Sequence, residues 1–146
     1  MKVIVDTNIV FSILANSNGN LSKQYFQSPS QFNYYAPDFL VTELQLHSSK
    51  ILKLSGLTKI NYEISKTSVF SLLNFVDTEL IPEEYMRKAV ALTKDIDFKD
   101  FKFVALTLFL NGLLWTGDRK LLNGLRRKGF MNVVNTKELS IISGGL

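Results

Sequence analysis

Three consecutive β-branched aliphatic residues, Val3, Ile4 and Val5, are followed directly by Asp6. A strand that is apolar at every position is buried on both faces, and such strands are typical of parallel sheets covered by helices on both sides. A second apolar run at residues 112–116 precedes Asp118 in the same manner. Parallel strands end at one edge of their sheet, where open α/β folds bind ligands, so two acids that follow neighbouring strands are expected to converge there.

Strand and helix patterns alternate along the rest of the chain, which predicts an α/β fold: a three-layer sandwich with a largely parallel central sheet flanked by helices. A length of 146 residues suits one domain, residues 1–146. We expect further strands at residues 31–36, 75–81 and 131–134. The expected helices span residues 8–15, 21–26, 62–73, 97–110 and 118–128, with others from residue 37 to a stop at Gly56 and from Pro82, and a last turn or helix at the C-terminus.

The composition is that of a soluble globular protein, with 46% hydrophobic and 21% charged residues. The absence of cysteine excludes disulfides and thiolate zinc sites. We see neither a secretory signal nor an apolar stretch long enough to span a membrane, so a cytoplasmic protein is expected. The chain has 17 basic against 13 acidic residues, which is compatible with a polyanionic partner and equally with an ordinary solvated surface.

Several acids stand where they can either cap helices or bind a cation. Asp6, Asp118 and the pair Asp97 and Asp100 all occur at expected helix starts, where capping is the simpler explanation of each one alone. Glu43 instead lies within a helix beside apolar residues, where burial of a lone carboxylate is costly. Together the acids form a set of oxygen ligands that suits Mg²⁺ or Mn²⁺, because zinc favours His or Cys.

Four separated motifs, in this order, resemble the PIN-domain nuclease family. They are VIVDTN at residues 3–8, TEL at residues 42–44, DFKDFKFVAL at residues 97–106 and LWTGDRKL at residues 114–121. In size and in the sequences of these motifs, the chain is most similar to the VapC-like subgroup, whose members are often toxins of bacterial or archaeal toxin–antitoxin pairs. The resemblance implies a metal-dependent endoribonuclease that leaves 5′-phosphate and 3′-hydroxyl ends, a homodimer, and a cognate antitoxin as a partner besides RNA.

The resemblance also implies roles for individual residues. Asp6, Glu43, Asp100 and Asp118 are the expected catalytic and metal-binding acids, and Asp97 is a fifth expected metal ligand. Asp6 and Asp118 are expected to hold the metal directly or through water, Asp100 to share a ligand role with the attacking water, and Glu43 to orient that water or act as a base. Asn8 and Thr116 are expected supporting groups that orient the acids.

Basic residues near these motifs are weak candidates for RNA contacts, through salt-sensitive binding of phosphates. They are Lys99, Lys102, Arg119 and Lys120. His47, one helical turn after Glu43, is expected to be a partly exposed helix residue rather than a ligand.

Two other functions remain open at this point. A catalytically silent binding module would use the acids only as helix caps. A phosphohydrolase of the haloacid-dehalogenase type normally has a second Asp two residues after the first, and this chain has Asn8 there.

Overall fold

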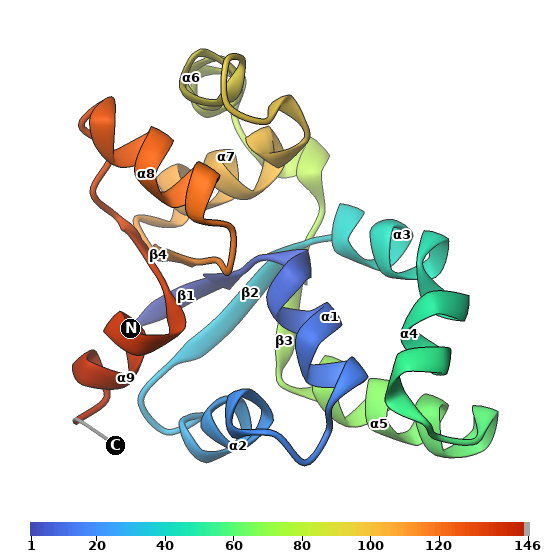
Figure 1. Ribbon diagram of the computed structural model, residues 1–146. Helices are drawn as coiled ribbons and strands as arrows, with labels where there is room; N and C mark the ends of the chain where they lie inside the picture. Colours follow the sequence, from blue (N-terminus) through green and yellow to red (C-terminus); the bar gives the residue numbers. More distant parts are fainter. Residues whose placement is uncertain (145–146) are drawn as a thin grey trace.

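The computed structural model describes residues 1–144 and has a central sheet of five parallel strands. The strand order is β3-β2-β1-β4-β5, with β1 in the middle (Figure 1). The predicted three-layer α/β fold is therefore confirmed, and the sheet is parallel throughout these residues. The strands are β1 (Lys2–Val5), β2 (Asn33–Pro37), β3 (Leu73–Val76), β4 (Leu113–Trp115) and β5 (Val133–Val134).

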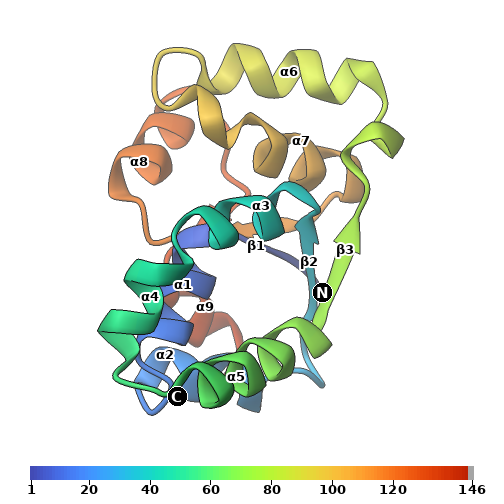
Figure 2. The same cartoon turned by 90° about the vertical axis from the view of Figure 1, so that its right-hand side faces the viewer.

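Helices cover both faces of the sheet (Figures 1 and 2). One layer contains α6 (Glu83–Thr93), α7 (Phe101–Leu110) and α8 (Arg119–Arg127). The other contains α1 (Thr7–Ala15), α2 (Asn20–Gln27), α4 (Ser48–Ser55), α5 (Lys59–Ser71) and α9 (Thr136–Ile142), while α3 (Phe39–Leu46) follows the end of β2. Two short 3₁₀ turns are η1 (Thr78–Leu80) and η2 (Phe98–Asp100). Within residues 1–144, no helix has both the length and the apolar character needed to cross a membrane.

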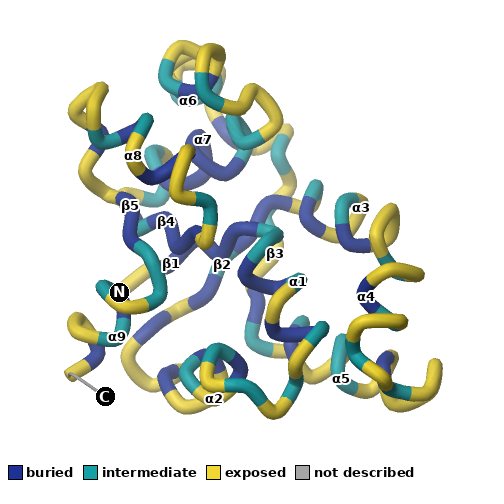
Figure 3. The backbone as a smooth tube through the Cα atoms, viewed as in Figure 1, coloured by how far each residue is buried: buried dark blue, intermediate teal, exposed yellow. Residues whose placement is uncertain are grey.

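The buried core lies where the two helical layers meet the sheet (Figure 3). Val3, Ile4 and Val5 are fully buried, as expected for a strand covered on both faces. The middle of α7, from Phe103 to Thr107, is also buried. Because both elements are buried, the end of β1 and the start of α7 are held at the carboxyl edge of the sheet. The residues that follow β1 and those that precede α7 therefore also lie at this edge.

The middle of the sheet is also the point where the chain reverses its direction of winding. β1 pairs with β2 on one side and β4 on the other, with Val5 opposite Trp115. The backbone N–H of Asp6 continues this ladder by donating to the carbonyl of Trp115 at 3.0 Å. The loops after β1 and β4 therefore lie side by side, at the kind of junction where open α/β sheets bind ligands.

Two predicted elements are wrong. The helix expected from residue 37 to Gly56 is interrupted at His47, whose φ of −106° and ψ of 9° end α3 and begin α4. The strand expected at residues 75–81 is displaced: β3 pairs with β2 through Leu73–Val76. The Asp77 side chain then accepts from the N–H of Glu79 and starts η1, so the following residues leave the sheet.

Candidate metal centre

Asp6 is the most buried acid at the carboxyl edge of the sheet, with only 3% of its surface exposed. It caps α1, and its Oδ1 accepts from the N–H of Thr7 at 2.7 Å. Burial raises the pKa of Asp6, hydrogen bonds from Thr116 and the Thr7 backbone oppose the rise, and the charges of Glu43 and Asp118 add to it, which together bring the pKa to about 6. The position thus holds a carboxylate whose negative charge is costly without a compensating positive charge.

The Thr116 hydroxyl joins the two central loops. It donates to Oδ2 of Asp6 at 2.8 Å and accepts from the backbone N–H of Asp118 at 3.0 Å. Asn8 reinforces this junction, since its Nδ2 donates to Asp6 Oδ2 at 3.1 Å and to Thr116 Oγ1 at 3.3 Å, while its Oδ1 accepts from the N–H of Gly117 at 2.9 Å. These contacts fix the direction of the Asp6 carboxylate relative to Asp118.

Three further carboxylates gather beside Asp6. Asp97, Asp100 and Asp118 each offer one oxygen, and these oxygens lie within 4.8 Å of one another. Asp97 caps η2 by accepting from the N–H of Lys99 at 3.1 Å, and Asp118 caps α8 by accepting from the N–H groups of Lys120 and Leu121. The capping predicted for these two residues is therefore present, and it leaves their second oxygens available.

Asp100 is the acid most strongly perturbed by its surroundings. It is half-buried at the first turn of α7, and the residues described contain no hydrogen bond to its side chain at this cap. Burial, together with repulsion by the charges of Asp6, Asp97, Asp118 and Glu43, raises its pKa to about 8. A carboxylate repelled by four others is favourable only when it is protonated or shares a cation with them.

Glu43 reaches the same place from α3. Its Oε1 accepts a hydrogen bond from the Thr7 hydroxyl at 2.6 Å, and its side chain is half-buried. Together, Asp6, Glu43, Asp97, Asp100 and Asp118 line one hollow, and we call these five residues the acidic cluster.

The composition of the acidic cluster fits a hard divalent cation. No ion pair within residues 1–144 involves any of its five carboxylates. Its donors are carboxylate oxygens, the ligands that Mg²⁺, Mn²⁺ and Ca²⁺ prefer. Burial and mutual repulsion, both visible in the raised pKa values of Asp6 and Asp100, are reduced when a cation binds between such groups.

The predicted basic residues lie outside this hollow. Lys99, Arg119 and Lys120 are exposed beside the cluster in sequence, and none of them lines the hollow. Lys102 points elsewhere: its Nζ lies 4.2 Å from the centre of the Phe39 ring, in a neighbouring depression. The structure therefore places the side chains of these four residues outside the hollow, although the backbone N–H groups of Lys99 and Lys120 donate to Asp97 and Asp118.

Four residues that were not predicted to belong to the site line the hollow. They are Thr7 and Phe11 on α1, His47 at the junction of α3 and α4, and Lys50 on α4. His47 is exposed, as expected. The spacing of Glu43 and His47, four residues apart, was a usable signal for His47, because helical residues with that spacing share one face. No such signal existed for Lys50, which lies on a separate helix beyond the break at His47.

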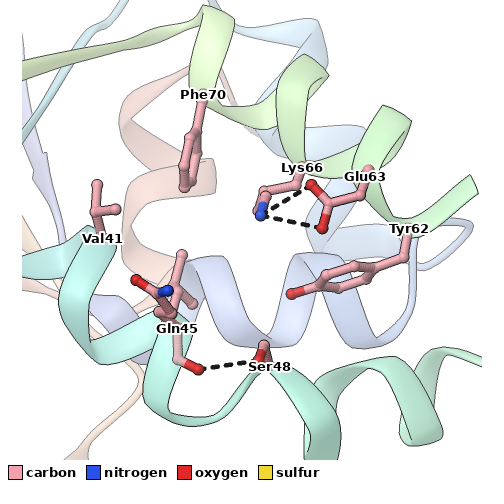
Figure 4. A pocket seen from close by; sticks show the side chains of 8 residues that line it. Val41, Gln45, Ser48, Tyr62, Glu63, Lys66 and Phe70 are labelled. Atoms are coloured by element: carbon pink, nitrogen blue, oxygen red, sulfur yellow. Dashed lines mark hydrogen bonds and ion pairs between the residues drawn. The ribbon is translucent and has the colours of Figure 1, made fainter. Parts of the chain in front are cut away.

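A second cavity, between α3, α4 and α5, has a different character (Figure 4). Its one acid, Glu63, pairs with Lys66 at 3.0 Å. The remaining lining is apolar or neutral: Val41, Leu44, Gln45, Ser48, Tyr62 and Phe70. This cavity does not provide the group of uncompensated carboxylates that a metal requires.

Replacing Thr116 by Val tests the support of the cluster. Val keeps the shape of Thr but leaves Asp6 Oδ2 without its nearest donor. We expect the free energy of unfolding to fall by about 1–3 kcal/mol and affinity for Mn²⁺ to fall roughly 10–100-fold. Denaturant unfolding and calorimetric titration measure the two effects.

Thr93→Val is the matched control for this prediction, since Thr93 is a buried threonine whose hydroxyl donates to a helix carbonyl. This control should lower the free energy of unfolding and leave the affinity for Mn²⁺ unchanged. Equal Mn²⁺ affinity in Thr116→Val and wild type would contradict the supporting role.

Comparisons with known proteins identify relatives of this fold. A family model described as PIN domain matches residues 4–139. A chain of the crystal structure of VapBC2 from Rickettsia felis, bound to a DNA fragment from their promoter, aligns with a TM-score of 0.68 and 16% identity, covering 92% of this chain and 98% of that one. PAE2754 from Pyrobaculum aerophilum aligns with a TM-score of 0.67 and 16% identity, covering 100% and 97%. The TM-scores show that the two structures share the fold of this chain, and at 16% identity the likeness extends to the fold alone. A search of curated proteins found no match.

Proposed function

The chain belongs to the PIN domain family, and from this premise we propose that it is a metal-dependent endoribonuclease acting at the acidic cluster. One observation carries the proposal. Five carboxylates from four different parts of the chain line one hollow at the carboxyl edge of the sheet, and none is neutralised by an ion pair within the described residues. Such an arrangement is unfavourable for a purely structural site and suitable for one that binds Mg²⁺ or Mn²⁺.

We assign roles from the contacts of each acid. Asp6, Asp97, Asp100 and Asp118 are the proposed metal ligands, with Thr116 and Asn8 fixing the direction of Asp6. When bound in such a site, a divalent cation lowers the pKa of water and offsets the charge on a scissile phosphate.

Glu43 has a separate proposed role as the residue that orients or deprotonates the attacking water. The Thr7 hydroxyl contacts only its Oε1, so within residues 1–144 its Oε2 has no hydrogen-bond partner and is available to accept a proton. This contact also fixes the direction of the carboxylate toward the hollow.

The charge balance supports a nucleic-acid substrate. Of the 13 acidic residues of the chain, five lie in the acidic cluster and eight lie elsewhere, whereas of the 17 basic residues all but Lys50 lie outside the hollow. The surface outside the cluster is therefore clearly basic, as expected for a protein that approaches a phosphate backbone. RNA is the proposed substrate, in agreement with the motif resemblance.

We further propose that the protein is the toxin of a toxin–antitoxin pair. Support comes from the VapC-like motifs and from the fold shared with the VapBC2 chain. The proposal includes a homodimer in the cytoplasm and a cognate antitoxin protein. Its test is co-expression with the small protein of the adjacent gene: the antitoxin should co-purify with this chain and suppress its ribonuclease activity.

The alternative function is a catalytically silent binding module, in which the acids only cap helices. Three of the acids fit it, since Asp6, Asp97 and Asp118 all cap helices. Capping does not account for Glu43, which lies within α3, or for Asp100, whose side chain makes no capping hydrogen bond. The phosphohydrolase alternative has less support, because Asn8 occupies the position of the second Asp and uses its amide to join the two central loops.

The chemistry of the product ends tests the proposed function. Hydrolysis by a water positioned in a metal site does not use the ribose 2′-hydroxyl, so we expect 5′-phosphate and 3′-hydroxyl ends. An RNA with one 2′-deoxyribose at the cleavage site should still be cut. End-group analysis of labelled products, with Mg²⁺ or with chelator, measures this. Cyclic 2′,3′-phosphate ends that persist in chelator would contradict the proposal.

A further inference from the structure

The wall of the hollow formed by α1 and α4 carries a cation that the proposed chemistry does not use. Lys50, on α4, lines the same hollow as the acidic cluster. It forms no ion pair with any residue in 1–144, although five carboxylates share that hollow. Its side chain is instead held over an aromatic ring, with Nζ 5.8 Å from the centre of the Phe11 ring.

The position of Phe11 explains how Lys50 stays apart from the acids. Phe11 belongs to α1, five residues after Asp6, and is packed against the core. Its ring attracts the ammonium group through the negative face of its π system. Because Phe11 and Lys50 lie on two helices that pack against each other, α1 and α4, their backbones are held by secondary structure rather than by a loop.

A lysine placed in this way suits a phosphate. A divalent cation bound by the acidic cluster would offset part of the charge of the carboxylates and of the scissile phosphate, but a bound polynucleotide also brings the charges of the phosphates on either side of the scissile one. Lys50 is the ammonium group that faces the hollow, whereas Lys99, Lys102, Arg119 and Lys120 do not line it. An ammonium group binds a phosphate as a point charge, with no demand on base identity.

We propose that Lys50 binds a phosphate adjacent to the scissile one, that Phe11 positions the Lys50 ammonium group, and that the site therefore takes an RNA chain with at least two consecutive phosphates. This inference rests on the proposed ribonuclease function and adds a substrate requirement to it. A substrate with a single phosphate, such as a dinucleoside monophosphate without terminal phosphates, does not reach Lys50 and is a poor substrate.

The test compares Lys50→Ala with Lys53→Ala, a control on the same helix that does not line the hollow. Cleavage of a short single-stranded RNA by each protein is measured with Mg²⁺ at several salt concentrations. For Lys50→Ala we expect KM to rise about tenfold with a much smaller change in kcat. We also expect the slope of log(kcat/KM) against log salt to become shallower by about 0.7. Lys50→Arg, which keeps the positive charge, should have a KM and a salt slope close to those of wild type. Lys53→Ala should have the wild-type KM and salt slope.

Phe11→Leu separates positioning from binding. It keeps an apolar side chain against the core but removes the ring, so KM should rise by a few-fold while the salt slope stays at the wild-type value, because the charge remains. Identical KM and salt slope in Lys50→Ala and wild type would overturn the inference and leave the ribonuclease intact. Equal cleavage of a dinucleoside monophosphate and a longer RNA by wild type would also overturn it. Failure of folded wild type to cleave any RNA would instead remove the proposed function, and this inference with it.

Discussion

Asp100→Asn is expected to abolish RNA cleavage and, in the same protein, to raise the melting temperature measured without metal. Asn cannot supply the negative charge of a metal ligand, so we expect a loss of roughly 10³-fold or more in kcat, equivalent to about 4 kcal/mol. The stability effect has the opposite sign. Burial and the charges of Asp6, Asp97, Asp118 and Glu43 raise the pKa of Asp100 to about 8, so its ionised form is disfavoured in the folded state.

The gain in stability should depend on pH in a defined way. Asn has no ionised form, while the unfolded Asp100 ionises near its ordinary pKa of 3.8. The advantage of the variant should therefore grow as pH rises from about 4 to about 8 and become constant above that. Thermal unfolding in chelator at pH 5 and pH 8 measures the difference in melting temperature between the variant and wild type.

The control is Glu84→Gln, which removes an exposed acid on α6. It should have wild-type activity and no pH-dependent gain in melting temperature. Full activity of Asp100→Asn, or a lower melting temperature in chelator at pH 8, would contradict the metal-ligand assignment.

Wild-type protein without metal is expected to lose stability as pH rises from about 4 to about 8. An acid whose folded pKa is raised contributes stability below its unfolded pKa, and this contribution is lost up to the folded pKa. For Asp6 the loss ends at about pH 6 and for Asp100 at about pH 8. Asp95 and Glu138 have lowered pKa values, so their contribution is lost only as pH falls through the acidic range below about 4.

Divalent cations should reverse this loss. A ligand present at a hundred times its Kd stabilises the folded state by about 2.7 kcal/mol. For a chain of this size that corresponds to roughly 8 °C in melting temperature. Melting curves at pH 8 with Mg²⁺, Mn²⁺ or chelator measure the shift, and Asp100→Asn should show much less of it. A wild-type stability that is flat between pH 5 and pH 8 and insensitive to Mn²⁺ would be incompatible with the acidic cluster as a metal site.

The sequence was sufficient to predict the fold and the meeting of the acids, because both depend on local patterns. A fully apolar strand predicts a sheet covered on both faces, and acids that follow two such strands within a few residues lie at one edge. Asp6 and Asp118 follow this rule in the structure, on the adjacent strands β1 and β4. Their alternative explanation as helix caps is also correct, since a cap uses one carboxylate oxygen and leaves the other available.

What the sequence did not predict depends on packing between distant segments. The break between α3 and α4 at His47 has no proline or glycine to mark it, so one continuous helix was the natural prediction. Lys102 was expected near the site because it follows Asp100 by two residues. Residues two apart in a helix do not share a face, and its side chain instead lies over the Phe39 ring. Lys50 approaches the acids only because α4 packs against α1.

The most direct test of the central claim is a metal add-back experiment on end-labelled single-stranded RNA. Wild type and Asp100→Asn, purified in parallel, are stripped of metal with chelator and then titrated with Mg²⁺ or Mn²⁺. The account predicts no cleavage after stripping, cleavage by wild type that returns with added metal and saturates, and no return in Asp100→Asn. Cleavage by stripped wild type, or equal recovery in the two proteins, would show that the acidic cluster is not the metal-dependent active site.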